Sequence, residues 1–407
     1  MFYNSNFIDA DGLNEFIINR SQHDVHKKGT QSLNRFSVEE ETRLCEIPAN
    51  IRNLTFSIEN YKLLEINISS NIFPRLTSIT IDDNCIKNII RFILNGLEKL
   101  KNLKIGRGCV SNLYKGSNEG RFRITNCPNL CLIGIGDGSM QGYKYFELSN
   151  VPSLQSIHIG NKCFRYVGIL MLNGLEKLNS LSIGHDCMSS LYNQHDEYRF
   201  SLANCPNLCR LYIGGRSMHN FATFELSKLN SYQSIHMNDN TFSNVKRFVV
   251  NDLDTLKSLK LGRDCMSSSP NQFEDTSFSI ANCPNLCQIE IGDGSMQFYK
   301  RFELSNVNSL ESIHFGNNCF EKTGVFLLDG LEKLKSVVIG DSFGRRNLQG
   351  DQRFFRITNC PNLDELKIGR DSCSSYKQFE LWNVNSLQSI QFGERCFQHA
   401  NCALKGM

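Results

Sequence analysis

Hydrophobic and polar residues alternate along most of the chain in short runs that predict β-strands. Residues 146–150 read Phe-Glu-Leu-Ser-Asn and residues 154–160 read Leu-Gln-Ser-Ile-His-Ile-Gly. Each run has a period of two and ends at a residue that favours turns. Such alternation buries one set of side chains and leaves the other in solvent. Because no window of about ten residues in these runs keeps a helical period, we expect short parallel strands joined by turns.

The alternating pattern recurs along the chain as a repeat, and we call one copy, with its two strands, a coil. Coils are predicted to start at residues 68, 92, 122, 146, 170, 200, 224, 248, 278, 302, 326, 355 and 379. From residue 92 the steps run 30, 24 and 24, so the repeating unit is a triplet of 78 residues. A single coil cannot close its own core, and we therefore expect about thirteen coils to stack into a β-rich solenoid.

One motif connects this repeat to a known family. Residues 154–164 read Leu-x-x-Ile-x-Ile-Gly-x-x-Cys-Phe, which resembles the LxxLxL segment of leucine-rich repeats. Together with the run Asn-Cys-Pro-Asn-Leu at residues 126–130, it is most similar to the BspA-like subclass, found in bacterial and protist surface antigens. The resemblance covers about residues 54–407 and implies binding and adhesion, with no catalytic residues to carry over. The sequence differs from the subclass in lacking a leader and an anchor, and in often having Cys where Ala usually precedes Phe.

The first part of the chain does not follow the repeat. We interpret residues 1–50 as an N-terminal cap or flexible segment and residues 51–407 as the leucine-rich-repeat-type solenoid. A cap would shield the apolar edge of the first coil from solvent.

Composition and charge narrow the classes of partner. The net charge is +3, from 44 Lys+Arg and 41 Asp+Glu that are interleaved along the chain, so no basic stripe indicates nucleic-acid binding. No apolar stretch of about 18 residues predicts a membrane span, and no basic segment followed by an apolar one predicts a signal peptide. We expect a monomeric cytoplasmic protein, with a cell-surface location only if a leader is missing.

Seventeen cysteines raise the questions of disulfides and of metal. Seven occupy one position of the repeat, namely Cys85, Cys109, Cys163, Cys187, Cys265, Cys319 and Cys396, and elsewhere Ser139, Ser217, Thr241 and Ser295 fill it. A position that accepts Cys, Ser or Thr needs a small, mostly buried side chain at a turn. The count is odd and no CxxC pair occurs, which favours reduced structural thiols over scattered disulfides or a metal site.

Two rows of polar residues invite chemical interpretations. His158, His236 and His314 are 78 residues apart, hence three coils or about 14 Å, too far to share a metal ion. The turn carboxylates, such as Asp239 and Asp293, are interrupted by arginines, a mixed-sign edge typical of turn chemistry and of protection against edge pairing. We expect no catalytic residue, no metal and no cofactor.

The first coil of each triplet is longer, and its extra residues fall in one connection. These connections span residues 109–121, 187–199, 265–277 and 342–354, and their sequences differ although the frame around them repeats almost verbatim. Loops also diverge when nothing constrains them. If they bind a partner, aromatic and arginine side chains are the expected contacts. The candidates are Tyr114, Lys115, Tyr192, His195, Phe273, Arg345 and Arg346, and the row of His158, His236 and His314 comes second.

These patterns predict a non-enzymatic module that binds or scaffolds a protein partner. A cell-surface adhesin of the same repeat type is the alternative. A carbohydrate-active β-solenoid enzyme is a more remote one, because it would need two carboxylates roughly 5–9 Å apart in a cleft, one of them with a raised pKa.

Overall fold

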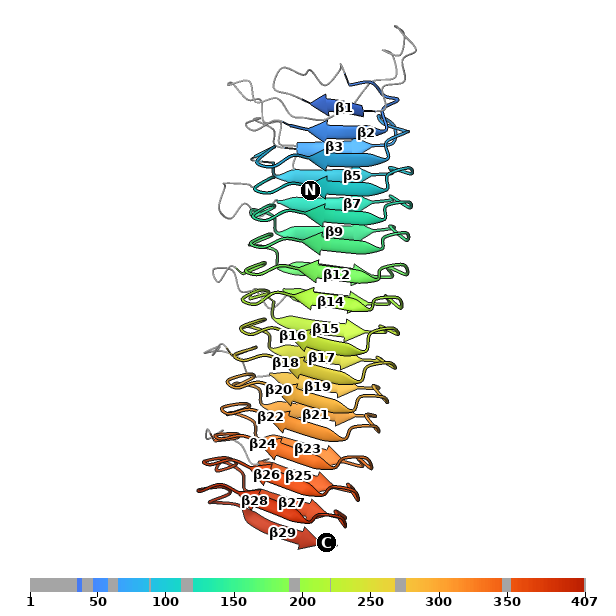
Figure 1. The fold of residues 1–407 in the computed structure, drawn as a ribbon. Helices are drawn as coiled ribbons and strands as arrows, with labels where there is room; N and C mark the ends of the chain where they lie inside the picture. The colour runs from blue at the N-terminus through green and yellow to red at the C-terminus, as the bar shows by residue number, and fades with distance from the viewer. Residues whose placement is uncertain are drawn as a thin grey trace, which may run out of the picture. The chain divides into compact units, whose positions relative to one another are not determined.

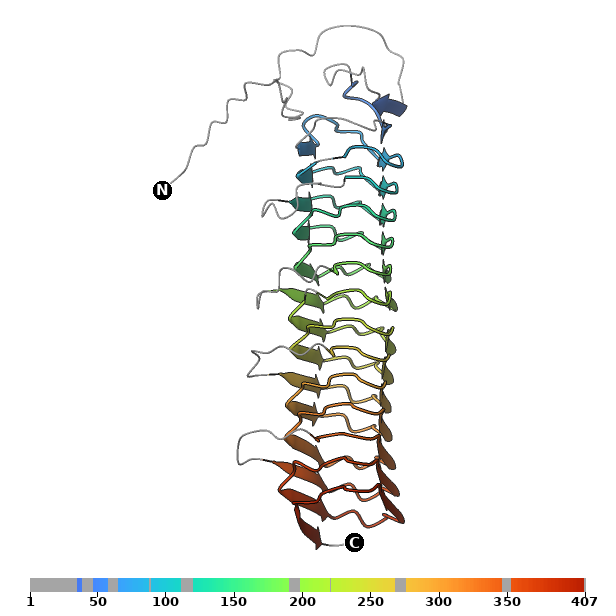
Figure 2. The same cartoon turned by 90° about the vertical axis from the view of Figure 1, so that its left-hand side faces the viewer.

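The protein is described by a computed structural model that covers residues 35–38, 47–57, 65–87, 89–110, 120–189, 198–219, 221–267, 276–345 and 353–405. It divides into two compact units, Met1–Val151 (unit 1) and Pro152–Met407 (unit 2). The residues described form strands and turns and contain no helix. In each unit the strands form two rows on opposite sides of the coils (Figures 1 and 2).

Unit 1 contains nine strands. They are β1 (Arg35–Val38), β2 (Asn53–Phe56), β3 (Glu65–Ser69), β4 (Ser78–Ile81), β5 (Arg91–Asn95), β6 (Asn102–Ile105), β7 (Arg121–Thr125), β8 (Leu132–Ile135) and β9 (Tyr145–Ser149). One parallel row runs β1-β2-β4-β6-β8 and the other β3-β5-β7-β9. Strand β1 belongs to the segment that we interpret as a cap or flexible segment, and it pairs with β2. The boundary at residue 50 stays a prediction.

Unit 2 repeats the arrangement. Its strands are β10 (Ser156–Ile159), β11 (Ile169–Asn173), β12 (Ser180–Ile183), β13 (Arg199–Ala203), β14 (Arg210–Ile213), β15 (Thr223–Ser227), β16 (Ser234–Met237), β17 (Arg247–Asn251), β18 (Ser258–Leu261), β19 (Ser277–Ala281), β20 (Gln288–Ile291), β21 (Arg301–Ser305), β22 (Ser312–Phe315), β23 (Val325–Asp329), β24 (Ser336–Ile339), β25 (Phe354–Thr358), β26 (Glu365–Ile368), β27 (Gln378–Trp382), β28 (Ser389–Phe392) and β29 (Asn401–Lys405). The odd-numbered strands β11 to β29 form one continuous parallel row. The even-numbered strands form two rows, β10-β12-β14 and β16 to β28. Each unit is thus a β-rich solenoid of leucine-rich-repeat type.

The strand register confirms the predicted coil starts, with one correction. Phe200, Phe224 and Phe248 are paired in neighbouring strands as predicted. In unit 1, however, Ile66 pairs with Phe92, so the first coil starts at residue 66 and not at residue 68. Ile66 and Ile68 are both buried, and a period of two cannot distinguish registers that differ by two residues. At β29, Cys402 pairs with Phe379, which adds a start at residue 402.

A stack of phenylalanine rings fills the core of unit 2 behind the odd-numbered row. The ring centroids of Phe224 and Phe248 are 4.9 Å apart, those of Phe248 and Phe278 are 4.9 Å apart, and those of Phe278 and Phe302 are 5.0 Å apart. All four rings are buried. These distances match the strand spacing of roughly 4.8 Å, so each ring covers the ring of the next coil.

Close stacking also explains a column of glycines at the end of the even-numbered strands. A Cβ added to Gly214 would lie 2.6 Å from the carbonyl carbon of Gly184, and one added to Gly292 would lie 2.7 Å from that of Gly262. No side chain fits at that distance. The glycine therefore lets the backbones of two coils approach closely.

Asparagines close the turn after the odd-numbered strands. Asn282 and Asn306 both have a φ of 52°, a left-handed conformation that asparagine tolerates better than most residues. The Nδ2 of Asn306 donates to Oδ1 of Asn282 at 2.7 Å, and Nδ2 of Asn282 donates to Oδ1 of Asn251 at 3.1 Å. The repeated asparagines thus join successive coils as a ladder.

The phenylalanine stack can be tested by the variant Phe278→Ala. We expect it to lower the free energy of unfolding by about 3–5 kcal/mol, because it removes a fully buried ring from between two others. The control Ser279→Ala, on the outer face of the same strand, should change this free energy by no more than about 0.5 kcal/mol. Urea unfolding followed by circular dichroism measures both, and equal losses would contradict the assignment of faces.

Candidate functional site

The four long connections lie almost entirely outside the described residues. Tyr114, Lys115, Tyr192, His195, Phe273 and Arg346 belong to this part of the chain, so their role stays a prediction. Arg345 is described and exposed at the point where one connection begins.

The points where these connections leave and rejoin unit 2 are well anchored. The hydroxyl of Ser189 donates to the carbonyl of Asp186 at 2.9 Å, and that of Ser267, 78 residues later, donates to the carbonyl of Asp264 at 3.0 Å. At the return points, Tyr198 is buried, and so is Thr276, whose hydroxyl donates to the carbonyl of Phe298 at 2.8 Å. Successive connections therefore start from equivalent, fixed positions of the frame.

The three histidines of the second candidate row lie in unit 2, exposed on the outer face of β10, β16 and β22. In the register His158 faces Ser182, His236 faces Lys260, and His314 lies between Glu290 and Val338. The structure does not bring the histidines together. No group of three or more His, Cys, Asp or Glu residues that could hold a metal ion occurs in the described part of the chain.

A polar cluster on β12, β14 and the turns after them was not predicted from the sequence. The hydroxyl of Tyr212, a residue that is 45% exposed, lies 3.1 Å from Nε2 of His185. Arg216 donates two hydrogen bonds to the carboxylate of Asp186, at 2.9 and 3.2 Å. The only sequence signal is an aromatic residue at an outward strand position, which alone does not indicate a site.

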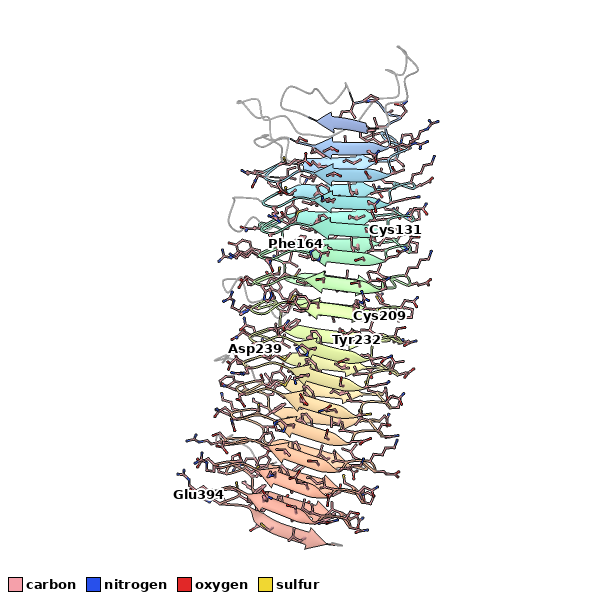
Figure 3. All side chains as sticks on the ribbon, viewed as in Figure 1. Cys131, Phe164, Cys209, Tyr232, Asp239 and Glu394 are labelled. Carbon is pink, nitrogen blue, oxygen red and sulfur yellow. The ribbon has the colours of Figure 1, made fainter. Side chains whose placement is uncertain are left out.

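The carboxylates in the turns of unit 2 accept hydrogen bonds from the backbone of the neighbouring coil. Asp239 and Asp293 each accept a backbone hydrogen bond from the next coil, from Arg263 N at 2.8 Å and from Asn317 N at 2.7 Å. Asp239 and Glu394 both lie at the edge of the unit opposite Cys209 (Figure 3). The hydrogen bonds of Asp239 and Asp293 thus join the turns of successive coils.

Carboxyl groups of unit 2 that have a shifted pKa, such as Asp329 and Glu365, have it lowered. A hydrogen bond from Thr358 holds the pKa of Asp329 below its ordinary value, and one from Lys367 does the same for Glu365. A general acid in polysaccharide cleavage needs the opposite shift.

One solvent-open depression of about 580 Å³ lies on the asparagine side of unit 2. Its lining residues are polar or small: Gly174, Glu176, Asn204, Pro206, Lys228, Asn230, Asp252 and Asp254. Apolar, enclosing walls hold most small ligands, and this depression does not have them.

The cysteines of the turn column are buried as predicted except Cys396, which is half-buried, and their hydrogen bonds explain the exchange with serine. The Cys187 thiol donates to the carbonyl of Gly160 at 3.0 Å, and the Ser217 hydroxyl donates to that of Gly184 at 2.9 Å. A thiol and a hydroxyl at this position therefore donate to the equivalent glycine carbonyl of the preceding coil. The sixteen cysteines in the described residues are free thiols.

No protein-family model matches the chain, and no curated protein does. Among solved structures, the chain is similar to a leucine-rich repeat protein from Bacteroides ovatus ATCC 8483, at 14% identity over 93% of this chain and 97% of that chain, with a TM-score of 0.19. It is also similar to a leucine-rich cell surface protein from Faecalibacterium prausnitzii A2-165, at 15% identity over 84% of this chain and 89% of that chain, with a TM-score of 0.20. The Bacteroides protein is a leucine-rich repeat protein, the class that residues 154–164 resemble.

Within the described residues, no helix is long and apolar enough to cross a membrane.

The burial of the cysteines predicts a pattern of thiol reactivity. Burial raises the pKa of Cys109 and of Cys283 to about 11 and that of Cys319 to about 12, so at pH 8 about one thiol in a thousand or fewer is a thiolate at these positions. Iodoacetamide should modify the exposed Cys209 and Cys402 first, and the three buried thiols only after denaturation. Peptide mapping by mass spectrometry measures this order.

The same thiols should be insensitive to reduction. A reducing agent is expected to leave the melting temperature unchanged. A large drop on reduction would reveal a disulfide framework and contradict the assignment of free thiols.

Proposed function

We propose that the chain is a non-enzymatic protein-binding module that presents its long connections to a protein partner. The observation that carries the proposal is the contrast between frame and connections. Ser189 and Ser267 anchor two connections by the same hydrogen bond, whereas residues 190–197 and 268–275 differ in sequence. Connections that differ in sequence but start from equivalent anchored positions are suited to recognising a partner.

The spacing favours a macromolecular partner over a small ligand. Unit 2 carries three of the connections, 77 or 78 residues and three coils apart, so their anchors span about 29 Å at roughly 4.8 Å per coil. A standard protein interface, which buries about 800 Å² on each partner, extends over a similar distance. The exposed Arg345, at the start of the last connection, is the kind of residue that contributes strongly to such interfaces.

Surface charge supports a protein partner over nucleic acid. Basic side chains on the outer faces form ion pairs, such as Arg123 with Glu147 at 2.6 Å and Lys260 with Glu290 at 2.8 Å. These pairs leave little unbalanced positive charge for phosphate groups. The proposal extends to a monomer in a reducing compartment, where buried thiols such as Cys187 stay reduced.

Trimming the connections tests the proposal. Replacing residues 190–197, 268–275 and 346–352 with the short turn of a 24-residue coil should preserve the β-rich circular dichroism and the melting temperature, because most coils already close with that turn. Binding to a partner captured by the parent protein should weaken at least about tenfold, equivalent to 1.4 kcal/mol. Titration with the purified partner measures this change.

The histidine row provides the matched control. A triple variant with His158, His236 and His314 replaced by alanine changes exposed residues of the frame and should bind as the parent does. If the trimmed protein keeps its affinity and the histidine variant loses it, the strand face is the binding surface and the proposal is wrong.

A further inference from the structure

The even-numbered row of unit 2 is interrupted between β14 and β16, although the odd-numbered row is continuous through the same coils. Strands β13, β15 and β17 are paired over their full five-residue lengths. Strand β14 ends one sheet and β16 begins another. The strands on one side of the solenoid are thus paired here, and those on the other side are not. We call the interface between β14 and β16 the seam.

Missing backbone hydrogen bonds mark the seam. In the next coil, the backbone amides of Lys257 and Ser258 both donate to the carbonyl of Gln233, at 2.8 and 3.3 Å. The equivalent donors one coil earlier are Gln233 and Ser234. Within the described residues, neither donates to the carbonyl of Cys209. The seam therefore lacks the bonds that hold its neighbours together.

Two side chains take the place of the missing bonds. Tyr232 occupies the position that Leu208 and Leu256 fill in the neighbouring coils, and its buried ring places the hydroxyl 3.4 Å from the carbonyl of Leu211, to which it donates. Asn238 replaces the column glycine, and its Nδ2 donates to the carbonyl of Ile213 at 2.8 Å. Figure 3 labels Tyr232 and Cys209 on the same side of the unit.

The two residues together are larger than the leucine and glycine that they replace. At the equivalent position of the previous coil, a Cβ added to Gly214 would lie 2.6 Å from the backbone of Gly184. Asn238 carries such a Cβ, and Tyr232 adds a ring where leucine is usual. As a result Leu211 is partly exposed, although the equivalent Leu181 and Leu259 are each only 1% exposed.

We infer that the seam is a hinge: unit 2 bends by opening β14 away from β16 while the odd-numbered row stays paired. Opening breaks hydrogen bonds that cross the seam, among them those of Tyr232 and Asn238 and the bond from the Arg216 amide to the carbonyl of Asp239 at 3.4 Å, and it exposes part of one ring. No strand pair is lost. The anchors at Ser189 and Ser267 lie on either side of the seam, so bending changes their separation. This inference concerns the motion of unit 2 and does not rest on the proposed function.

Hydrogen exchange of the full chain tests the seam. We expect the amides of Ser234 and His236, which face β14, to exchange at least about tenfold faster than those of Ser258 and Lys260, with residues 199–203 and 223–227 as protected as other odd-numbered strands. The double variant Tyr232→Leu/Asn238→Gly restores the usual residues, and it should slow the exchange of Ser234 and His236 to the level of Ser258 and Lys260.

Three results would overturn the inference. The amides of Ser234 and His236 in the parent could be as protected as those of Ser258 and Lys260. The double variant could leave their exchange unchanged. Strands β13 and β15 could exchange as fast as β16, which would mean that the coils separate completely.

Distance measurements separate a moving hinge from a static gap. Asn179 and Lys257 can each be replaced by a keto amino acid that carries a spin label, and this pair of labels spans the seam. A second pair, at Lys257 and Lys335, spans coils whose strands are paired. All three positions are exposed, and each pair is 78 residues apart. The first pair should give the broader distance distribution in electron double resonance, and Tyr232→Leu/Asn238→Gly should narrow it to the width of the second. Equal widths in the parent would refute the hinge.

Discussion

The rest of the structure depends on one constraint, which is that neighbouring coils must come within backbone hydrogen-bonding distance of each other. Strand pairing sets a rise of roughly 4.8 Å per coil. In most odd-numbered strands an aromatic ring at the second residue then meets the ring of the next coil, as Phe224 and Phe248 do at 4.9 Å. A glycine is required where two backbones approach too closely for a Cβ, as at Gly292. Each set of equivalent positions in successive coils therefore accepts only certain residue types, and for this reason the sequence repeats almost verbatim.

The polar columns obey the same constraint. Asparagines in the left-handed turn, such as Asn306, direct their amides to the coil before. The thiol or hydroxyl of the cysteine column binds a carbonyl of the preceding coil, as Cys187 and Ser217 show. The cysteine content thus follows from stacking geometry, because a small donor is needed at that turn. A metal or a disulfide framework is not required to explain it.

Much of this could be predicted from the sequence, because columns imposed by stacking reappear every coil. The strand positions, the triplet of 78 residues and the buried faces of residues such as Phe278 follow from periodicity alone. The first coil was placed two residues too late, since Ile66 and Ile68 satisfy a period of two equally well. The candidate residues on the connections could be proposed from divergence, but a repeat pattern says nothing about the conformation of residues that do not repeat.

The seam shows a different limit of sequence reasoning. Tyr232 is apolar enough for a core position and Asn238 is common in turns, so each looks like ordinary drift when its position is considered alone. Their joint effect appears only when both meet the previous coil and β14 is left unpaired from β16. Because the stability of a solenoid is approximately a sum over neighbouring coils, such a weak interface costs stability locally and does not spread. The odd-numbered row, paired through β13, β15 and β17, holds the coils together. A repeat protein can therefore change its flexibility at one interface without losing the frame that positions its connections.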